Sequence, residues 1–332
     1  NSGPVTHLTG PGFPPPQRRE RTTMTTIAQK PGAQAVPPVG AAEKKKVRLS
    51  RSLILPALIF ALVLTQIPFL VTIYFSMLNW NQLYPNEVGF NWFANYVTVF
   101  TGPDFLSSLG ATVLITGSSV VLSLLFGLGF AILLDRKFPG QAIARTLLIT
   151  PFLIMPAAAA LIWKWSMLDA NVGMINFALT SLGLPAVAWN TDLPAVTIIM
   201  LLTWQFTPFM MLILLAGLQS QSKDVLEAAS VDGSGAIRTF QWITLPHMRQ
   251  YIEIATLLGS IMLLQVFDPI AIMTKGTGGT KTLSYLLYER AFIGLDVGQA
   301  AAFGVVTVFI TILVATIALR TLFKVFMNGG DR

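Results

Sequence analysis

Long apolar stretches, separated by shorter polar segments, occupy most of this chain. A helix rises about 1.5 Å per residue, so each stretch is long enough to cross about 30 Å of hydrocarbon. The pattern predicts six membrane-spanning helices, at residues 52–78, 107–134, 144–167, 193–219, 251–272 and 299–325. The fold class expected from this pattern is an all-α polytopic membrane protein.

Composition supports lipid as the outer solvent. The chain is 53% hydrophobic and 11% charged, whereas a soluble domain carries about 25% charged residues. The net charge is +7, but the basic residues flank apolar stretches and form no stripe typical of nucleic-acid binding. The sequence has no cysteine, and its two histidines, His7 and His247, are too few for a histidine-rich metal site.

The two ends of the chain differ from its middle. Residues 1–50 are rich in proline, glycine, threonine and charge, which predicts a disordered cytoplasmic tail. Met24 is a candidate start, which would make residues 1–23 a vector-derived or upstream extension. We expect a transmembrane domain at 51–326 and a cytoplasmic tail at 327–332.

Basic residues indicate the orientation of the spans. The outer segments 79–105 and 169–192 contain no lysine or arginine, whereas the segments on the other side contain many. Because basic residues concentrate on the cytoplasmic side, both termini are predicted to be cytoplasmic.

The segment between the fourth and fifth spans, residues 220–250, is far longer than a plain connection requires. Good helix formers at 224–229, a glycine turn at 233–235 and further helix formers at 236–243 predict a helix, a turn and a second short helix. Two interpretations remain open for this segment. It is either an amphipathic helix on the membrane surface or a docking element for a cytoplasmic partner.

The same segment resembles the signature of ABC importer permeases. Glu227-Ala228-Ala229, three residues, Gly233, nine residues, Ile243, one residue and Leu245-Pro246 match that pattern at every defined position. The resemblance implies a type I importer permease fold of the maltose-type, larger-partner family. It also implies that this coupling loop contacts the ATPase through these residues: Glu227, Ala228, Ala229, Asp232, Gly233, Ile243, Leu245 and Pro246.

The resemblance extends over about residues 52–326. Family members usually have proline after the glycine pair Gly278-Gly279, and here the residue is Thr280. The large extracellular insertion of some maltose permeases is also missing. Both departures weaken an assignment to maltose but not to the family.

Polar groups at membrane depth usually face the protein interior or a substrate path. Amides, carboxylates and aromatic faces suit a sugar. By resemblance, the substrate-binding residues are expected in the fourth and fifth spans: Gln205, Phe206, Phe209, Gln265 and Asp268. Each could instead serve helix packing or, for Asp268, pairing with a second subunit.

The resemblance implies a permease half that imports a small sugar, disaccharide or polyol across a prokaryotic cytoplasmic membrane. Its implied partners are a second homologous permease, two ATPase subunits, an extracytoplasmic solute-binding protein and lipid, with no nucleic acid. The chain lacks a phosphate-binding loop, so it is not expected to be an enzyme. It is expected to bind no cofactor or metal itself, with ATP and Mg bound by the ATPases.

Two other classes of function remain as alternatives. A self-sufficient channel or ion-coupled secondary transporter often has internal repeats and intramembrane charges, and neither is prominent here. A membrane enzyme would need a buried nucleophile–base pair or a cluster of metal ligands.

Overall fold

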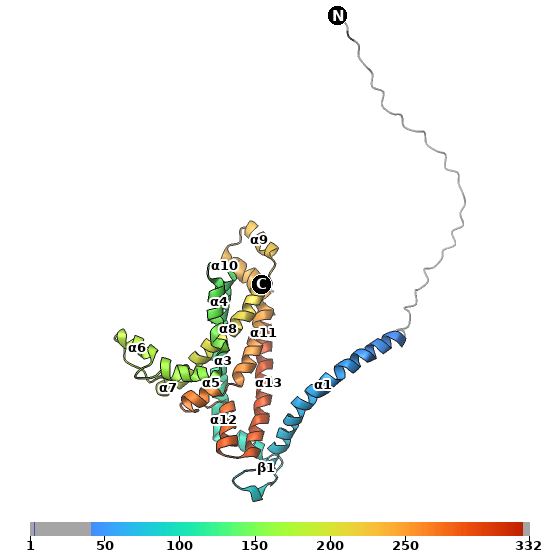
Figure 1. Cartoon of the computed structure of the whole chain (residues 1–332), viewed down its shortest axis with the longest axis vertical. Coiled ribbons are helices and arrows are strands. Elements are labelled where there is room, and N and C mark those ends of the chain that lie inside the picture. Colours follow the sequence, from blue (N-terminus) through green and yellow to red (C-terminus); the bar gives the residue numbers. More distant parts are fainter. Residues whose placement is uncertain (1–2, 4–40, 328–332) are drawn as a thin grey trace, which may run out of the picture. The chain divides into compact units, whose positions relative to one another are not determined.

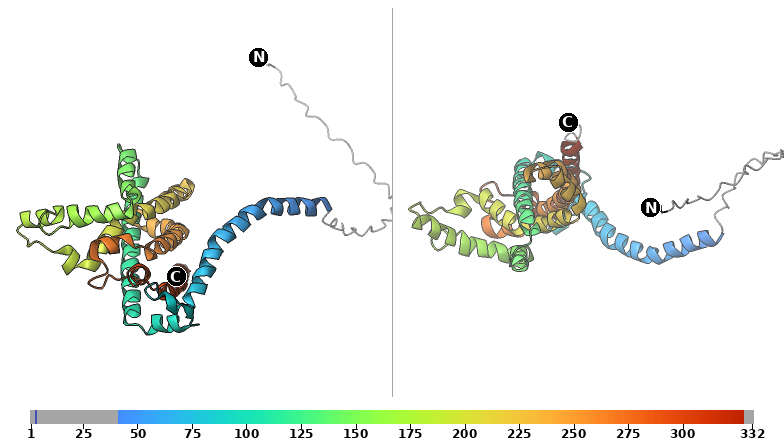
Figure 2. Two further views of the ribbon diagram at one scale, coloured as in Figure 1. Left: turned by 60° about the horizontal axis from the view of Figure 1, so that its bottom comes forward. Right: turned by 90° about the horizontal axis from the view of Figure 1, so that it is seen from above.

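The computed structural model describes Gly3 and residues 41–327, with side-chain surroundings for residues 55–317 and Arg320. The chain divides into two units, Asn1–Phe60 and Ala61–Arg332. The second unit is a bundle of helices (Figures 1 and 2), and every contact described below lies within it.

The backbone is almost entirely helical. The α-helices are α1 (Ala41–Ser76), α2 (Ala94–Thr101), α3 (Pro103–Asp135), α4 (Gln141–Leu153), α5 (Pro156–Leu161), α6 (Met174–Ser181), α7 (Trp189–Asp192), α8 (Pro194–Gln219), α9 (Lys223–Val231), α10 (Ala236–Thr239), α11 (Leu245–Leu264), α12 (Leu283–Tyr288) and α13 (Val297–Met327). The 3₁₀ helix η1 (Pro85–Glu87) and the π-helices η2 (Ile162–Met167), η3 (Phe240–Thr244), η4 (Ile270–Thr274) and η5 (Glu289–Ile293) complete the helical elements.

Helices occupy all six predicted spans, but not all are single straight spans. Among the described residues, four helices are long and apolar enough to cross a membrane, within α1, α3, α8 and α13. The α4 helix and the α5–η2 helix are apolar enough only as a pair and meet at 94°, so together they form either one broken span or a re-entrant loop. Pro151 lies inside α4 and Pro156 begins α5, and proline removes a backbone donor and permits such a bend.

The remaining predicted span, 251–272, differs most from expectation. Its helix, α11, begins earlier, at Leu245, and its first half carries His247, Arg249 and Glu253. The helix ends at Leu264, and η4 resumes only at Ile270. The fifth predicted span is therefore an interrupted element with a polar start, and the count of six membrane crossings stays a prediction.

The segment boundaries also differ from expectation near both ends. Helix α1 begins at Ala41 and not near residue 51, because the stretch AAEKKKVRLS consists mostly of good helix formers. The rest of the predicted N-terminal tail, apart from Gly3, lies outside the described residues. At the other end, Met327 still belongs to α13, and 328–332 lie outside the described residues.

A small hairpin interrupts the all-helical pattern. Strands β1 (Leu78–Asn79) and β2 (Gly89–Phe90) pair antiparallel, with Leu78 opposite Phe90. Asn95 is buried and donates hydrogen bonds from Nδ2 to the carbonyl oxygens of Ser76 and Leu78, at 2.9 and 2.8 Å. Figure 1 shows this hairpin at one end of the bundle and α9 with α10 at the opposite end.

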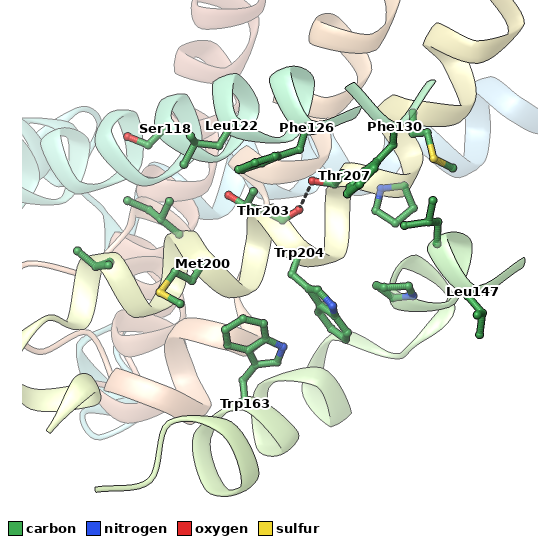
Figure 3. A pocket seen from close by; sticks show the side chains of 16 residues that line it. Ser118, Leu122, Phe126, Phe130, Leu147, Trp163, Met200, Thr203, Trp204 and Thr207 are labelled. Carbon is green, nitrogen blue, oxygen red and sulfur yellow. Dashed lines mark hydrogen bonds between the residues drawn. The ribbon is translucent and has the colours of Figure 1, made fainter. Parts of the chain in front are cut away.

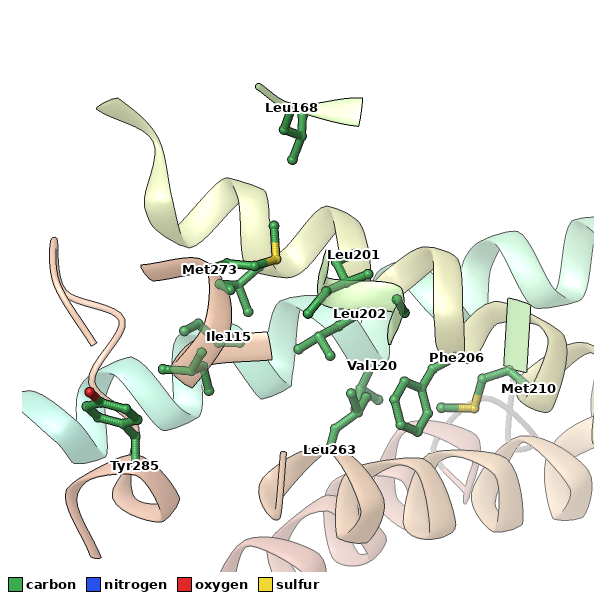
Figure 4. Packing of buried hydrophobic residues seen from close by; sticks show 14 of the residues in the cluster. Ile115, Val120, Leu168, Leu201, Leu202, Phe206, Met210, Leu263, Met273 and Tyr285 are labelled. Atoms are coloured by element: carbon green, nitrogen blue, oxygen red, sulfur yellow. The ribbon is translucent and has the colours of Figure 1, made fainter. Parts of the chain in front are cut away.

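The core of the bundle forms where α3, α8 and α11 pack together. Ile115, Leu202 and Met210 are among its buried members; Figure 4 shows α8 side chains meeting those of α3, Leu263 of α11 and Met273 of η4. Helix α3 faces α8 with small residues four apart along the helix: Ser119, Ser123, Gly127 and Ala131. Such residues allow helix backbones to approach closely in a membrane protein.

Candidate functional site

The first candidate site is the loop at 220–250, which folds as the sequence predicts into a helix, a turn and a second helical segment. Helix α9 is followed by α10, which continues through η3 into α11. Of the residues in α9, only Ala229 is buried. Glu227 and Ala228 are exposed, so the acidic residue of the signature is open to solvent at the tip of the loop.

Gly233 ends α9 in a specific hydrogen-bonded turn. The Gly233 amide donates to the Ser230 carbonyl at 3.1 Å, and the Ser234 amide donates to the Ala229 carbonyl at 2.9 Å. Gly233 has a φ of +75°, the left-handed value that this Schellman motif requires and that glycine adopts most easily. Asp232, just before it, is exposed and forms the C-cap of α9.

The second half of the signature anchors the loop to the bundle. Leu245 packs against a buried cluster that includes Leu214, Met248 and Ile252. Ile243 is half-buried, and Pro246 lies in the first turn of α11, where a missing N–H costs nothing. The signature thus divides into an exposed tip and a packed base.

Large apolar side chains near the tip are unexpectedly exposed. The exposed fractions are 87% for Val231, 76% for Ile237 and 64% for Trp242. The sequence marked Ile237 and Trp242 only as apolar positions of a second helix. Exposed apolar side chains beside a charged residue are typical of a surface that a protein partner covers.

The second candidate site is a groove of about 740 Å³ beside α8. Figure 3 shows Trp163 and Trp204 on one side of it and Phe126 and Phe130 on the other. The two tryptophan rings are 5.6 Å apart and tilted by 56°. The groove is lined from α3, α4, η2 and α8 by Ser118, Leu122, Phe126, Phe130, Leu147, Leu148, Pro151, Trp163, Val196, Ile199, Met200, Thr203, Trp204, Thr207, Pro208 and Met211.

Few polar residues line this groove, and one of them has a hydroxyl without a partner. The Thr203 side chain is 8% exposed, and its Oγ1 has no hydrogen-bond partner among the described residues. The Thr207 hydroxyl donates to the Thr203 carbonyl at 2.6 Å. A buried hydroxyl without a partner has an unused donor and acceptor, but the Thr203 oxygen itself is not exposed to the groove.

None of the five predicted substrate-binding residues lines this groove. On α8, the groove residues recur every three to four positions from Val196 to Met211, and Gln205 and Phe209 lie on the other face of the helix. The helical spacing of Thr203, Trp204 and Thr207 was available in the sequence. What the sequence did not show is which face of α8 borders the groove.

Gln205 instead holds the bend between α4 and α5. Its side chain is 3% exposed, and its Nε2 donates to the Ile154 carbonyl at 2.9 Å. Its Oε1 has no hydrogen-bond partner among the described residues. Phe152, beside the bend, stacks on Phe209 with ring centroids 5.3 Å apart and meets Phe206 edge-on at 6.1 Å.

Gln265 and Asp268 lie in the break between α11 and η4. Gln265 is exposed and Asp268 half-buried. Their neighbours Val266 and Phe267 pack against the same core cluster as Phe206 and Phe209, so the two predicted segments border one core. The structure brings these segments near each other without forming a single cavity from the five side chains, and their role in binding stays a prediction.

Hydrogen bonds in the loop that contains Gly278-Gly279 account for Thr280, which stands where family members usually have proline. The Thr280 side chain is fully buried; its hydroxyl lies 2.7 Å from that of Thr274 and donates to the Thr277 carbonyl at 2.7 Å. The Thr280 amide also donates to that carbonyl, at 3.2 Å. A proline at position 280 would lose the hydrogen bond of the amide and both hydrogen bonds of the hydroxyl. The hydrogen bonds that close this loop therefore depend on threonine.

Two polar residues organise the outer segment between η2 and α8. Asn176 is buried; its Nδ2 donates to the carbonyls of Asp169 and Val187, while its Oδ1 accepts from Trp189 Nε1 at 3.0 Å. Hydrogen bonds from the backbone amides of Asn171 and then Val172 lower the pKa of the Asp169 carboxyl. The described residues contain no cluster of three or more potential metal ligands of the His, Cys, Asp and Glu types.

A helical bundle with bent and interrupted apolar helices, a groove between them and a projecting loop is typical of membrane transport proteins. The chain is 31% identical over 300 residues to a probable ABC transporter permease protein, y4oQ, of Sinorhizobium fredii, which covers 88% of this chain and 97% of that relative. It is 32% identical over 277 residues to the trehalose/maltose transport system permease protein MalF of Thermococcus litoralis. That alignment covers 82% of this chain and 92% of the relative. The chain belongs to the family of ABC transporter permease proteins.

Other comparisons agree on the family and the fold. Identity is 28% over 309 residues with the trehalose transport system permease protein SugA of Mycobacterium tuberculosis, covering 93% of this chain and 99% of that one. A solved bacterial ABC transporter involved in the import of alginate matches with a TM-score of 0.71 at 20% identity, over 85% of this chain and 98% of that chain. No family model matches the chain.

Proposed function

We propose that this chain is one of two permease subunits of a binding-protein-dependent importer in a prokaryotic cytoplasmic membrane. A homologous permease forms the other half of the path, two ATPase subunits bind and hydrolyse ATP with Mg, and an extracytoplasmic protein delivers the solute. Both chain termini are cytoplasmic. The observation that carries the proposal is the exposed α9 tip on a packed base, at the end of the bundle opposite the β1–β2 hairpin.

The proposed docking element is α9. Glu227 supplies a charge, and Ala228 and Ala229 allow close approach because their side chains are small. Exposed Val225 and Val231 add apolar area on the same helix. When the ATPases close on ATP, the docked α9 of each permease is displaced, and the helices that carry it change the access of the path.

The test is co-purification with the cognate ATPase subunit, using an affinity tag on the ATPase. We expect the unmodified chain to co-purify and Ala228→Asp to be lost, because a charge at this small, exposed position obstructs the contact. Ser222→Asp, an exposed position before α9, serves as the matched charge control and should be retained. Normal association of Ala228→Asp would contradict docking and would favour a surface-lying helix.

The proposed cargo is a small sugar, disaccharide or polyol. Two relatives are named for trehalose or for trehalose and maltose. The groove offers the aromatic faces that cover sugar C–H surfaces, with Trp163 and Trp204 at its wall. We propose that the second permease supplies the opposite wall, and that Gln265 and Asp268 contribute polar contacts further along the path.

Sugar uptake in reconstituted vesicles tests this cargo. Radiolabelled trehalose and maltose are offered with the binding protein, and Trp204→Ala is compared with Trp165→Ala, whose exposed ring lies outside the groove. We expect Trp204→Ala to lower uptake about fivefold and Trp165→Ala to leave it unchanged, since a stacking aromatic contributes on the order of 1 kcal/mol. Equal uptake by both variants would exclude the groove from the path.

A further inference from the structure

A polar cluster joins the two ends of the coupling loop, where it meets α8 and α11. Its residues are not part of the permease signature. Ser220 follows the last residue of α8, while His247 and Tyr251 lie in the first two turns of α11. The Tyr251 hydroxyl donates to Ser220 Oγ at 2.8 Å. The Ser220 Oγ also lies 3.0 Å from His247 Nε2.

The hydrogen-bonding capacity of Ser220 is completely used. Its hydroxyl donates to the Gly217 carbonyl at 2.8 Å, which uses its one proton, so its two acceptor positions remain for α11. Tyr251 fills one, and His247 Nε2 lies at the other, where it donates to Ser220 Oγ when it carries a proton. Ser220 thus links to two residues of α11 at once.

Close packing beneath this cluster keeps Tyr251 in place. A Cβ added to Gly217 would lie 2.5 Å from Tyr251 Cγ and 2.9 Å from Met248 Sδ. The Tyr251 ring therefore lies against the backbone of α8, which only glycine permits. Met248 is fully buried in a cluster with Met211, Leu214 and Leu215 of α8.

The location of this cluster matters for force transmission. The proposed docking helix α9 has one buried residue, so a displacement of α9 reaches the bundle mainly through the two ends of its loop. One end is α8, which carries Thr203 and Trp204, and the other is α11, which leads to Gln265 and Asp268. If the ends moved separately, the displacement would be lost in bending the loop.

We propose that Ser220, His247 and Tyr251 form a polar clamp that makes α8 and α11 move as one body when α9 is displaced. The clamp residues are positioning residues, and they contact neither solute nor nucleotide. The proposal rests on the proposed function, since it requires that an ATPase displaces α9.

The test uses the complete reconstituted complex and a reporter in the groove. The chain has no cysteine, so Ser118→Cys introduces its single thiol at a half-buried position that lines the groove. The rate of maleimide labelling is measured without nucleotide and with ATP plus vanadate. In the Ser118→Cys parent we expect the two rates to differ about fivefold or more, a factor that corresponds to about 1 kcal/mol.

Four variants in this background isolate the clamp. Tyr251→Phe and Ser220→Ala each remove a hydroxyl, Ser220→Thr keeps it, and Tyr84→Phe removes an exposed hydroxyl in the outer segment as the control. We expect Tyr251→Phe and Ser220→Ala to bind the ATPase and hydrolyse ATP normally while the labelling ratio falls toward one. Ser220→Thr and Tyr84→Phe should keep the parent ratio. A fifth variant that combines Tyr251→Phe with Ser220→Ala should be no worse than the stronger of the two alone.

Several results would overturn the clamp. A parent-like labelling ratio in Tyr251→Phe and Ser220→Ala would do so, as would a ratio that falls only together with ATPase association. A parent without a nucleotide response would show that the groove does not follow the ATPases. Ala228→Asp separates the two proposals: if it loses association while the clamp variants respond normally, docking stands and only the clamp fails.

Discussion

Gly233 shows how one residue determines the shape of the loop tip. An added Cβ would meet nothing within 4 Å there, so the glycine is required by its φ of +75° and not by space. Gly235, two residues later, also has open space but an ordinary φ of −70°. Alanine substitutions at Gly233 and Gly235 therefore distinguish the effect of backbone strain from the effect of an added methyl group.

Gly233→Ala is expected to weaken ATPase association about fivefold, because alanine in the left-handed region costs on the order of 1 kcal/mol. Gly235→Ala should associate like the unmodified chain. The measurement is quantitative pull-down of the ATPase in detergent over a range of concentrations. Equal weakening by both variants would mean that the tip tolerates no added methyl, and the role assigned to the turn would be wrong.

Gln205 gives a second expectation at the scale of a residue. Gln205→Ala removes the donor to Ile154 at the bend between α4 and α5 and leaves a buried carbonyl unpaired, at a cost of about 1–3 kcal/mol. If the role is packing alone, thermal stability of the purified complex falls and trehalose uptake per stable complex is retained. We predict instead that trehalose uptake is impaired while assembly of the complex stays largely intact.

Asp268→Ala is the companion experiment, because Asp268 is half-buried in the break and outside the bend that Gln205 holds. Impaired trehalose or maltose uptake in both variants, at normal assembly, would support a shared path. Wild-type uptake in both would exclude the predicted residues from substrate binding.

At the scale of elements, the approach of α3 to α8 depends on glycine. A Cβ on Gly127 would lie 2.9 Å from both Met210 Cβ and the Met211 amide nitrogen. A Cβ on Gly259 of α11 would instead meet the flexible end of the Met210 side chain, at Cε. The first obstacle includes backbone and cannot move aside, whereas the second is the end of a flexible side chain.

Gly127→Ala should therefore destabilise the complex by about 1–3 kcal/mol whatever occupies position 210. Gly259→Ala should be destabilising alone and largely rescued by Met210→Ala, which removes the obstructing atoms. Gly129→Ala, on the exposed face of α3 with nothing within 4 Å, is the control. Thermal unfolding in detergent measures each single variant and its combination with Met210→Ala, and rescue of Gly127→Ala by Met210→Ala would contradict the backbone contact.

At the scale of the whole molecule, the coupling loop and the outer hairpin lie at opposite ends of the bundle (Figure 1). Asn86 is exposed in the segment between β1 and β2, and Ser234 is half-exposed in the turn after α9. Helix α13 runs toward the end that carries α9. This arrangement is compatible with a cytoplasmic C-terminus and with a proposed docking loop on the same side.

Single cysteines at Asn86 and Ser234 are expected to be labelled from opposite sides of the membrane. In intact cells an impermeant maleimide should modify Asn86→Cys, and it should modify Ser234→Cys only after the membrane is opened. The chain without an introduced cysteine provides the blank, since it has no thiol. Modification of both positions from the same side would refute the orientation.

The sequence by itself determined the apolar helical segments and the turn of the coupling loop. Both are local: a long apolar run predicts a helix in lipid, and Glu227-Ala228-Ala229 followed by Gly233 predicts a helix and its end. Pro151 and Pro156 likewise marked a region where a helix can bend, although the 94° angle did not follow from them.

Only the tertiary structure decided which faces of the helices meet and which line the groove. The most apolar window of α8 is 67% buried, and a helix that is apolar on all sides has no polar stripe to reveal its orientation. Thus the sequence did not show that Gln205 bonds the α4–α5 bend, or that Trp204, which packs against the core, also lines the groove. The hydrogen bonds of Ser220 to α11 depend on residues 27 and 31 positions away, and no local pattern in the chain specifies such a pairing.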